Sequence, residues 1–185
     1  MELMNLELGQ IYYFEDRRVS LDGFPDDRSK SDLIAQFSLT PNTNWKLTSK
    51  LVHQPQDNTL SQKNLSVHYA KQGFAANIGY FFTEQELEQA LISAAYPLNS
   101  RWTLFAKVHR SLMFEKPVEN LLGLAYESCC WGIKILASQT SDSDVDFQVT
   151  ENRLYFELTL KGLGSGGDDI NTKLRNSIPG YQAGF

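Results

Sequence analysis

The two cysteines of the chain, Cys129 and Cys130, are adjacent, and their chemistry is the easiest to define. Thiols form disulfides, but neighbouring Cα atoms lie only about 3.8 Å apart, which is less than an ordinary disulfide spans. A bridge between these two residues would therefore be strained. If they are oxidised, we expect them to bond to cysteines outside this chain; the alternative is a reduced pair at a strand end. A zinc site is not predicted, because it needs about four ligands and none is suitably spaced nearby.

The other residues with chemical potential do not form a catalytic constellation. The segment 160–167 is rich in glycine but lacks the Gly-Lys-Ser/Thr ending of a phosphate-binding loop, so we interpret it as a flexible strand exit. His53, His68 and His109 fall on three separate predicted strands. Alternation places His68 and His109 on a shared polar face and His53 on the opposite face. We therefore expect no enzyme activity, no metal site and no cofactor.

The composition argues against several classes of function. The 185 residues carry a formal net charge of −5, whereas nucleic-acid-binding domains usually present a basic face, so no nucleic-acid partner is expected. No apolar run is long enough for a membrane-spanning helix, but a barrel strand needs apolar residues only at alternate positions. The aromatic content of 12% fits a strand-rich protein and the aromatic girdles of a membrane barrel.

Most of the chain alternates apolar and polar residues with a period of two, which is typical of strands with one apolar face. A short helix is predicted over 168–175, after the glycine-rich segment. About ten strands are predicted, near residues 5–14, 31–40, 45–54, 60–71, 74–83, 88–97, 102–111, 117–126, 130–139 and 152–162.

The connections between these strands alternate between tight turns and longer or more polar loops, a habit of bacterial outer-membrane barrels. The longest loops are predicted at 15–30 and 140–151. The predicted fold class is therefore all-β: an antiparallel transmembrane β-barrel segment, about ten strands of a larger barrel, followed by a short C-terminal helix and tail.

Five groups of residues carry a family resemblance: 9–14 with 16–19, 96–99 with 101–102, 126–131, 158–165 and 177–181. The most specific is Tyr-Glu-Ser-Cys-Cys-Trp at 126–131, which is followed by Leu-Lys-Gly-Leu-Gly at 160–164 and Ile-Pro-Gly-Tyr at 178–181. In this order, the segments resemble the C-terminal end of the LptD family of outer-membrane lipopolysaccharide-assembly proteins.

The resemblance implies a large barrel that inserts lipopolysaccharide into the outer leaflet of the outer membrane and opens laterally between its first and last strands. It implies an LptE-type lipoprotein in the lumen and an N-terminal periplasmic domain, absent here, that receives lipopolysaccharide from a periplasmic bridge. It also implies that Cys129 and Cys130, which match the family's adjacent cysteines, bond to cysteines of that domain. Residues 1–185 are then one region, the C-terminal portion of such a protein.

Barrel topology is compatible with this interpretation. A bacterial barrel normally ends with its last strand running toward the periplasm. Counting back from 152–162 puts the turn with Cys129 and Cys130 on the periplasmic side and the loop at 15–30 outside the cell. The last strand would form one side of the lateral exit, through residues Leu154, Tyr155, Phe156, Glu157, Leu158, Thr159 and Leu160.

Strand parity also predicts which side chains meet lipid. The side chains expected to face lipid are Trp131, Leu154, Phe156 and Leu158. Those expected to face the lumen or LptE are Lys134, Glu157, Thr159 and Lys161. Two alternatives stay open. The chain could be a self-contained small outer-membrane barrel, acting as a pore or a structural anchor, or a soluble β-sheet module that binds lipid.

Overall fold

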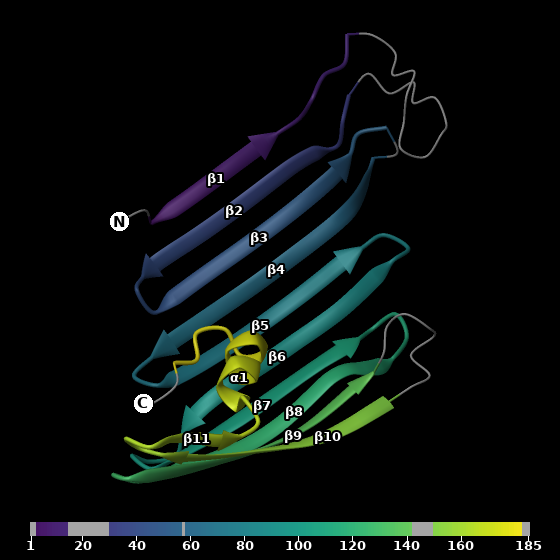
Figure 1. Cartoon of the computed structure of the whole chain (residues 1–185). Coiled ribbons are helices and arrows are strands. Elements are labelled where there is room, and N and C mark those ends of the chain that lie inside the picture. The colour runs from purple at the N-terminus through teal and green to yellow at the C-terminus, as the bar shows by residue number, and fades with distance from the viewer. Residues whose placement is uncertain (1–2, 15–29, 57, 142–149, 183–185) are drawn as a thin grey trace.

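The computed structural model describes residues 3–14, 30–56, 58–141 and 150–182, which form one antiparallel sheet and one short helix (Figure 1). Each strand pairs with the next one along the chain, from β1 to β11. The strands are β1 Met4–Gly9, β2 Leu33–Asn42, β3 Trp45–Gln54, β4 Thr59–Lys71, β5 Phe74–Thr83, β6 Leu87–Pro97, β7 Trp102–Ser111, β8 Lys116–Glu127, β9 Trp131–Ser141, β10 Thr150–Leu160 and β11 Gly164–Gly167, and the helix α1 is Ile170–Ser177.

The predicted all-β antiparallel fold is confirmed. Every predicted strand except the first agrees with an observed strand to within two residues at both ends. The first ends at Gly9 instead of continuing to residue 14, although Tyr12 still forms an isolated bridge with Lys30. The helix begins two residues later than predicted. The predicted long loops fall largely outside the described residues, at 15–29 and 142–149.

One prediction is wrong: the strand at 152–162 is not the last. It ends at Leu160, and the glycine-rich segment that we interpreted as a flexible exit folds back as β11, which pairs with residues 157–160. Gly167 makes this return possible. Its φ is +107°, and a Cβ atom there would lie 2.2 Å from the carbonyl oxygen of Phe156, so the close pairing requires glycine.

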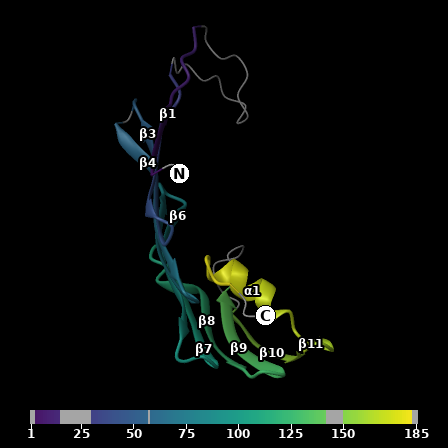
Figure 2. The ribbon, with the colours of Figure 1, turned by 90° about the vertical axis from the view of Figure 1, so that its left-hand side faces the viewer.

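The two edges of the sheet do not meet. Among the described residues, β1 pairs only with β2, and the first part of β10, residues 150–156, pairs only with β9. Figure 2 shows the sheet edge-on, with the strands near β8–β11 curving around α1, which lies on the concave side. This is a curved wall and not a closed cylinder.

The two faces of the wall differ in polarity. The convex face exposes large apolar side chains, including Ile78, Ile92, Val108, Leu122 and Leu154, which are 54–73% exposed. On the concave face, the register aligns polar side chains, and His68 Nδ1 lies 2.6 Å from Asn77 Oδ1. His109 lies on the same face, where its Nε2 is 2.9 Å from Gln89 Oε1. The predicted shared face of His68 and His109 is confirmed.

A glycine on the concave face leaves room for a core side chain. Gly123 on β8 lies between Phe105 on β7 and Leu136 on β9 in the strand register, and both neighbours are fully buried. A Cβ atom at Gly123 would lie 2.4 Å from Leu136 Cδ1 and 3.0 Å from the carbonyl oxygen of Ile135. The side chain of Leu136 thus occupies the space that any residue other than glycine would need.

We predict that Gly123→Ala lowers the free energy of unfolding by about 1–3 kcal/mol, because the added methyl group overpacks the concave face. The measurement is urea unfolding of the complete protein that carries this chain, in detergent, followed by tryptophan fluorescence. Gly166→Ala is the matched control, since nothing lies within 4 Å of a Cβ atom there. Equal unfolding midpoints for the two variants would contradict the close approach.

Candidate functional site

Residues 168–181, here called the C-terminal strap, lie across the concave face of the sheet. Asp169 caps α1, because its side chain accepts hydrogen bonds from the backbone N–H and the hydroxyl of Thr172, and these bonds lower its pKa. Ile170, Leu174 and the C-cap residue Ile178 recur every four residues, so they continue one side of the helix. All three are fully buried, in a core with Phe105, Leu121 and Leu136 of the sheet.

A buried ion pair fastens the strap to the wall. Lys134 on β9 and Glu157 on β10 are 6% and 4% exposed, and Lys134 Nζ lies 3.1 Å from Glu157 Oε1. Glu157 also accepts hydrogen bonds from the backbone N–H of Ile170 and from the side chain of Asn171. Lys134 donates a second bond to Asn171 Oδ1 at 2.9 Å. Such a pair holds its place because the neighbouring bonds offset part of its desolvation.

Both ends of the strap are attached to the sheet. At its start, Asp168 donates its N–H to the carbonyl oxygen of Phe156 and accepts the N–H of Phe156 on its carboxylate. At its end, the carbonyl oxygen of Pro179 accepts a bond from Asn77 on β5. Tyr181 packs edge-on against Phe105, with ring centroids 5.1 Å apart. Burial raises the pKa of Tyr181 to about 12. The strap thus joins β10 to β5 across the inner wall.

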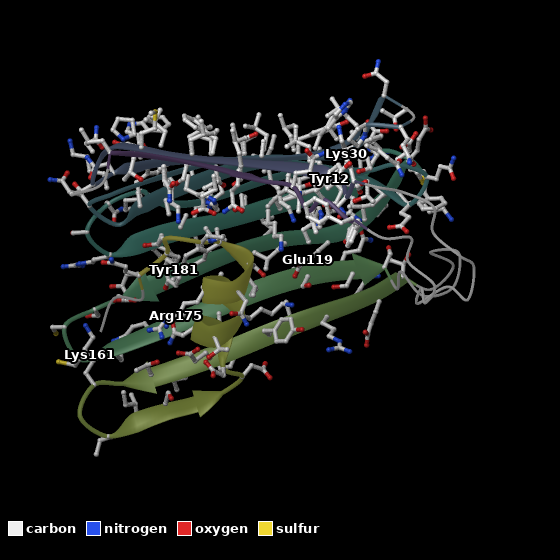
Figure 3. All side chains as sticks on the ribbon, turned by 90° about the horizontal axis from the view of Figure 1, so that it is seen from above. Tyr12, Lys30, Glu119, Lys161, Arg175 and Tyr181 are labelled. Atoms are coloured by element: carbon white, nitrogen blue, oxygen red, sulfur yellow. The ribbon has the colours of Figure 1, made fainter. Side chains whose placement is uncertain are left out.

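A second charged cluster holds the middle of the strap. Glu119 on β8 forms ion pairs with Lys107 on β7 and with Lys173 on α1, whose Nζ lies 3.3 Å from Glu119 Oε1. Ser177 also donates to Glu119. Figure 3 shows Glu119 and Tyr181 on the side of the sheet that carries the helix. The concave face therefore carries charged and polar side chains around the apolar contacts beneath the helix.

The cysteine turn, residues 128–130, connects β8 to β9, and both thiols are exposed. Their sulfur atoms lie 3.0 Å apart, so the thiol of Cys130 can donate to the sulfur of Cys129. That hydrogen bond lowers the pKa of Cys129 and raises the pKa of Cys130. The neighbouring hairpin is close, because Lys161 donates its N–H to the carbonyl oxygen of Cys130 at 2.9 Å. Cys129 is therefore the thiol of the pair that loses its proton at the lower pH.

Aromatic side chains form a row at the same end of the sheet as the cysteine turn. Trp102, Tyr126 and Trp131 stack in sequence, with centroid separations of 4.8 and 5.1 Å. A second run continues the row on earlier strands, with separations of 4.6–5.8 Å, through Trp45, Tyr69, Phe74 and Tyr96. Aromatic girdles of this kind mark the membrane–water interface of outer-membrane barrels. The row therefore indicates a membrane boundary beside the cysteine turn.

The predicted exit residues split between the two faces of β10. Leu154, Phe156, Leu158 and Leu160 are exposed, on the apolar face. On the inner face, Glu157 is buried, Thr159 donates to its carboxylate, and Tyr155 packs beside the core under Lys173.

Three other residues were predicted to lie on a particular face of the sheet. Trp131 is on the exposed apolar face and Lys134 is on the inner face. Lys161 is the exception: it does not face the lumen from a strand but lies, exposed, in the turn after β10 (Figure 3).

Sequence reasoning missed the docking of the strap. The spacing of Ile170, Leu174 and Ile178 signals an amphipathic helix, but it does not say which surface the helix covers. No helix in the described part of the chain is both long and apolar enough to cross a membrane. In that same part, no three His, Cys, Asp or Glu side chains gather in a way that could hold a metal ion.

The fold and this site define a class of protein. An antiparallel sheet with an apolar convex face, a polar concave face, an aromatic row and alternating short and long connections is a wall segment of a transmembrane β-barrel. Within that class, a family profile described as LptD, LPS transport system D, matches residues 1–102. The chain belongs to the LptD family.

Curated relatives extend the similarity to the whole chain. Two proteins called LPS-assembly protein LptD, from Thiobacillus denitrificans and Nitrosococcus oceani, are 32% and 31% identical over 98% and 100% of this chain. A third of that name, from Legionella pneumophila, is 30% identical over 100% of it. The chain spans about a quarter of the length of these relatives, 25–26%. The predicted family resemblance is confirmed.

We predict that Glu157→Gln lowers the free energy of unfolding by about 3–5 kcal/mol, because it leaves the charge of Lys134 buried without a counter-charge. Urea unfolding of the complete protein in detergent measures this change. The matched control is Glu151→Gln on the same strand, whose partner Arg153 is 58% exposed, so its unfolding midpoint should not move. A Glu157→Gln midpoint equal to that of the control would show that the ion pair does not hold the strap.

We predict that Cys129 of the reduced protein reacts with iodoacetamide at a lower pH than Cys130, because the lowered pKa makes it the thiolate of the pair. Fragment-ion mass spectrometry of singly alkylated protein locates the label. Cys130→Ala should shift the alkylation profile of Cys129 to higher pH, since the thiol donor is gone. Equal labelling of both positions at every pH would rule out this difference.

Proposed function

We propose that this chain is the C-terminal part of the barrel that inserts lipopolysaccharide into the outer leaflet of the outer membrane. The observation that carries the proposal is the edge of β10. Its residues 150–156 pair with no strand but β9 in the described part of the chain, and they lie between an apolar outer face and a polar inner face. Unpaired backbone is not tolerated in lipid, so this edge needs a further strand in the working protein.

A seam at this edge suits an exit for an amphiphile. When the seam opens, acyl chains reach the membrane through it while sugars stay on the polar side of the wall. β11 covers residues 157–160, the end of β10 nearer the cysteine turn, and leaves residues 150–156 uncovered. If the cysteine turn is periplasmic, the uncovered part lies at the level of the outer leaflet. The exit would then open toward the leaflet that receives lipopolysaccharide.

Family membership supports a proposal for the partners of this barrel. We propose that an LptE-type lipoprotein occupies the lumen and meets the concave face beside the strap. We propose also that a periplasmic N-terminal domain of the complete protein receives lipopolysaccharide from a bridge and forms disulfides with Cys129 and Cys130. Two exposed thiols in a turn beside an aromatic row support this, because they are accessible from the aqueous side of a membrane boundary. The barrel itself carries no catalysis in this proposal.

The alternative functions fit the geometry less well. A self-contained small barrel needs its first and last strands to pair, and within the described residues β1 pairs only with β2. A soluble lipid-binding sheet would leave a broad face of large apolar side chains in water, including Ile92, Leu122 and Leu154 at 60–73% exposed. Neither alternative uses the cysteine turn.

The first test is complementation in cells depleted of their own lipopolysaccharide-assembly protein. The complete protein that carries this chain should restore lipopolysaccharide at the cell surface, measured by labelling intact cells. Failure to restore it, with the protein present in the outer membrane, would overturn the proposed function.

The second test concerns the thiols. Cys129→Ser with Cys130→Ser should remove the inter-region bridges, so that the complete protein migrates at one position on gels with and without reductant. Ser128→Ala in the same turn is the control and should keep the reductant-dependent shift of the wild type. A double variant that still shifts like the wild type would show that other cysteines form the bridges.

A further inference from the structure

A shallow groove of about 630 Å³ crosses the convex face over β7–β10. Its apolar lining follows from the register, in which Ala106, Leu122, Ala137 and Leu154 form one row across the four strands. Small and large side chains alternate along that row, and Leu122 and Leu154 are 61% and 73% exposed. They stand about 10 Å apart, two strand spacings, with only the methyl group of Ala137 between them. This leaves a trough that a hydrocarbon chain can enter.

A row of carboxamides borders the trough. The next row along the strands places Asn120, Gln139 and Asn152 side by side on β8, β9 and β10. The side chain of Asn120 donates to Gln139 Oε1 at 3.2 Å. Burying amides against hydrocarbon is costly unless they are partnered, and that one bond uses only part of what two carboxamides can offer. The row can therefore bind the carbonyl and hydroxyl groups at which acyl chains join a headgroup.

The depth of the amide row fits this use. Gln139 lies eight residues along β9 from Trp131 of the aromatic row, since 139 − 131 = 8. At about 3.3 Å per residue and a strand tilt of about 40°, the separation along the membrane normal is about 20 Å. The apolar band of outer-membrane barrels is about 25 Å tall. The amides therefore lie near the boundary opposite the aromatic row.

Arg110 adds a positive charge beyond the row of carboxamides. Arg110 is exposed on β7, two residues beyond Val108 of the groove lining. It pairs with Ala90 of β6, and both lie on the convex face. The guanidinium of Arg110 donates to the carbonyl oxygen of Glu115 at 3.0 Å, which holds it against the turn after β7. Apolar trough, amides and guanidinium thus follow one another as acyl chain, chain linkage and phosphate do in an acylated anionic lipid.

We propose that this groove binds the lipid A portion of lipopolysaccharide as it leaves the barrel. The inference rests on the proposed function, because the groove adjoins the exit: Leu154 and Asn152 belong to the uncovered part of β10. A lipid that crosses this edge meets the groove first on the outer face. One acyl chain lies over Ala137 between the two leucines, its carbonyl bonds to the amide row, and a phosphate meets Arg110. A glycerophospholipid carries the same three groups and is the competing occupant.

Native mass spectrometry of the complete protein in detergent tests the proposal, with purified lipid A as one probe and phosphatidylglycerol as the other. Ala137→Leu fills the trough and should weaken retention of one lipid A by about tenfold. Gln139→Leu and Arg110→Gln should each weaken it by a smaller factor. Ala76→Leu, which adds the same side chain to the convex face on β5 outside the groove, is the matched control and should retain lipid A as the wild type does.

Equal retention by Ala137→Leu and the wild type, or an equal loss in Ala76→Leu, would overturn the groove as a site. If phosphatidylglycerol is retained as strongly as lipid A and is lost in the same variants, the assignment to lipid A is wrong. Complementation in depleted cells separates these outcomes from the proposed function. Restored surface lipopolysaccharide together with unchanged lipid A retention in Ala137→Leu would refute the groove alone.

Discussion

The pairing of backbone N–H and C=O groups is the constraint on which the rest of this structure depends. In a membrane the lipid offers no hydrogen bonds, so each strand must find both neighbours within the protein. Eight consecutive strands, β2–β9, satisfy this by pairing on both sides over most of their length, while β10 keeps a free edge at residues 150–156 in the described part of the chain. The alternation of apolar and polar residues follows, because every strand shows one side to lipid and the other to the interior.

The concave face meets a different demand, since a polar wall has little apolar surface with which to hold a helix. The strap meets it by combining two kinds of contact. Ile170, Leu174 and Ile178 provide the apolar area, and the pair between Lys134 and Glu157 fixes the position. Buried ion pairs add little net stability compared with apolar replacements, but one left without its partner is costly. The pair therefore defines where the strap binds more than how tightly it binds.

The sequence predicts the strands well because the alternation of apolar and polar residues depends only on neighbouring positions and is present in every hairpin. β9 and β10 are recovered to within two residues from side-chain pattern alone. β11 has no such pattern, since residues 164–167 are Gly-Ser-Gly-Gly, and its pairing depends on how closely Gly167 approaches Phe156. The helix begins two residues later than predicted, because Asp168 is bonded to Phe156 of β10 and Asp169 is the N-cap residue. The strap was missed since Asn77 and Pro179 are 102 residues apart.

β11 and the start of the strap both bind β10 at residues 157–160, and this asymmetry bears on how the proposed exit would open. Residues 157–160 are held by β11 from the side and, through Glu157, by Lys134 and the start of α1 from the inner face. Residues 150–156 have β9 as their paired strand, and only Phe156, at the boundary, bonds to Asp168. A strand that is held at one end and free at the other separates from a neighbouring strand first at its free end. Breaking a hydrogen-bonded residue pair there disrupts little other structure. We therefore expect that an opening of the proposed exit, if it starts at Thr150, stops where β11 begins.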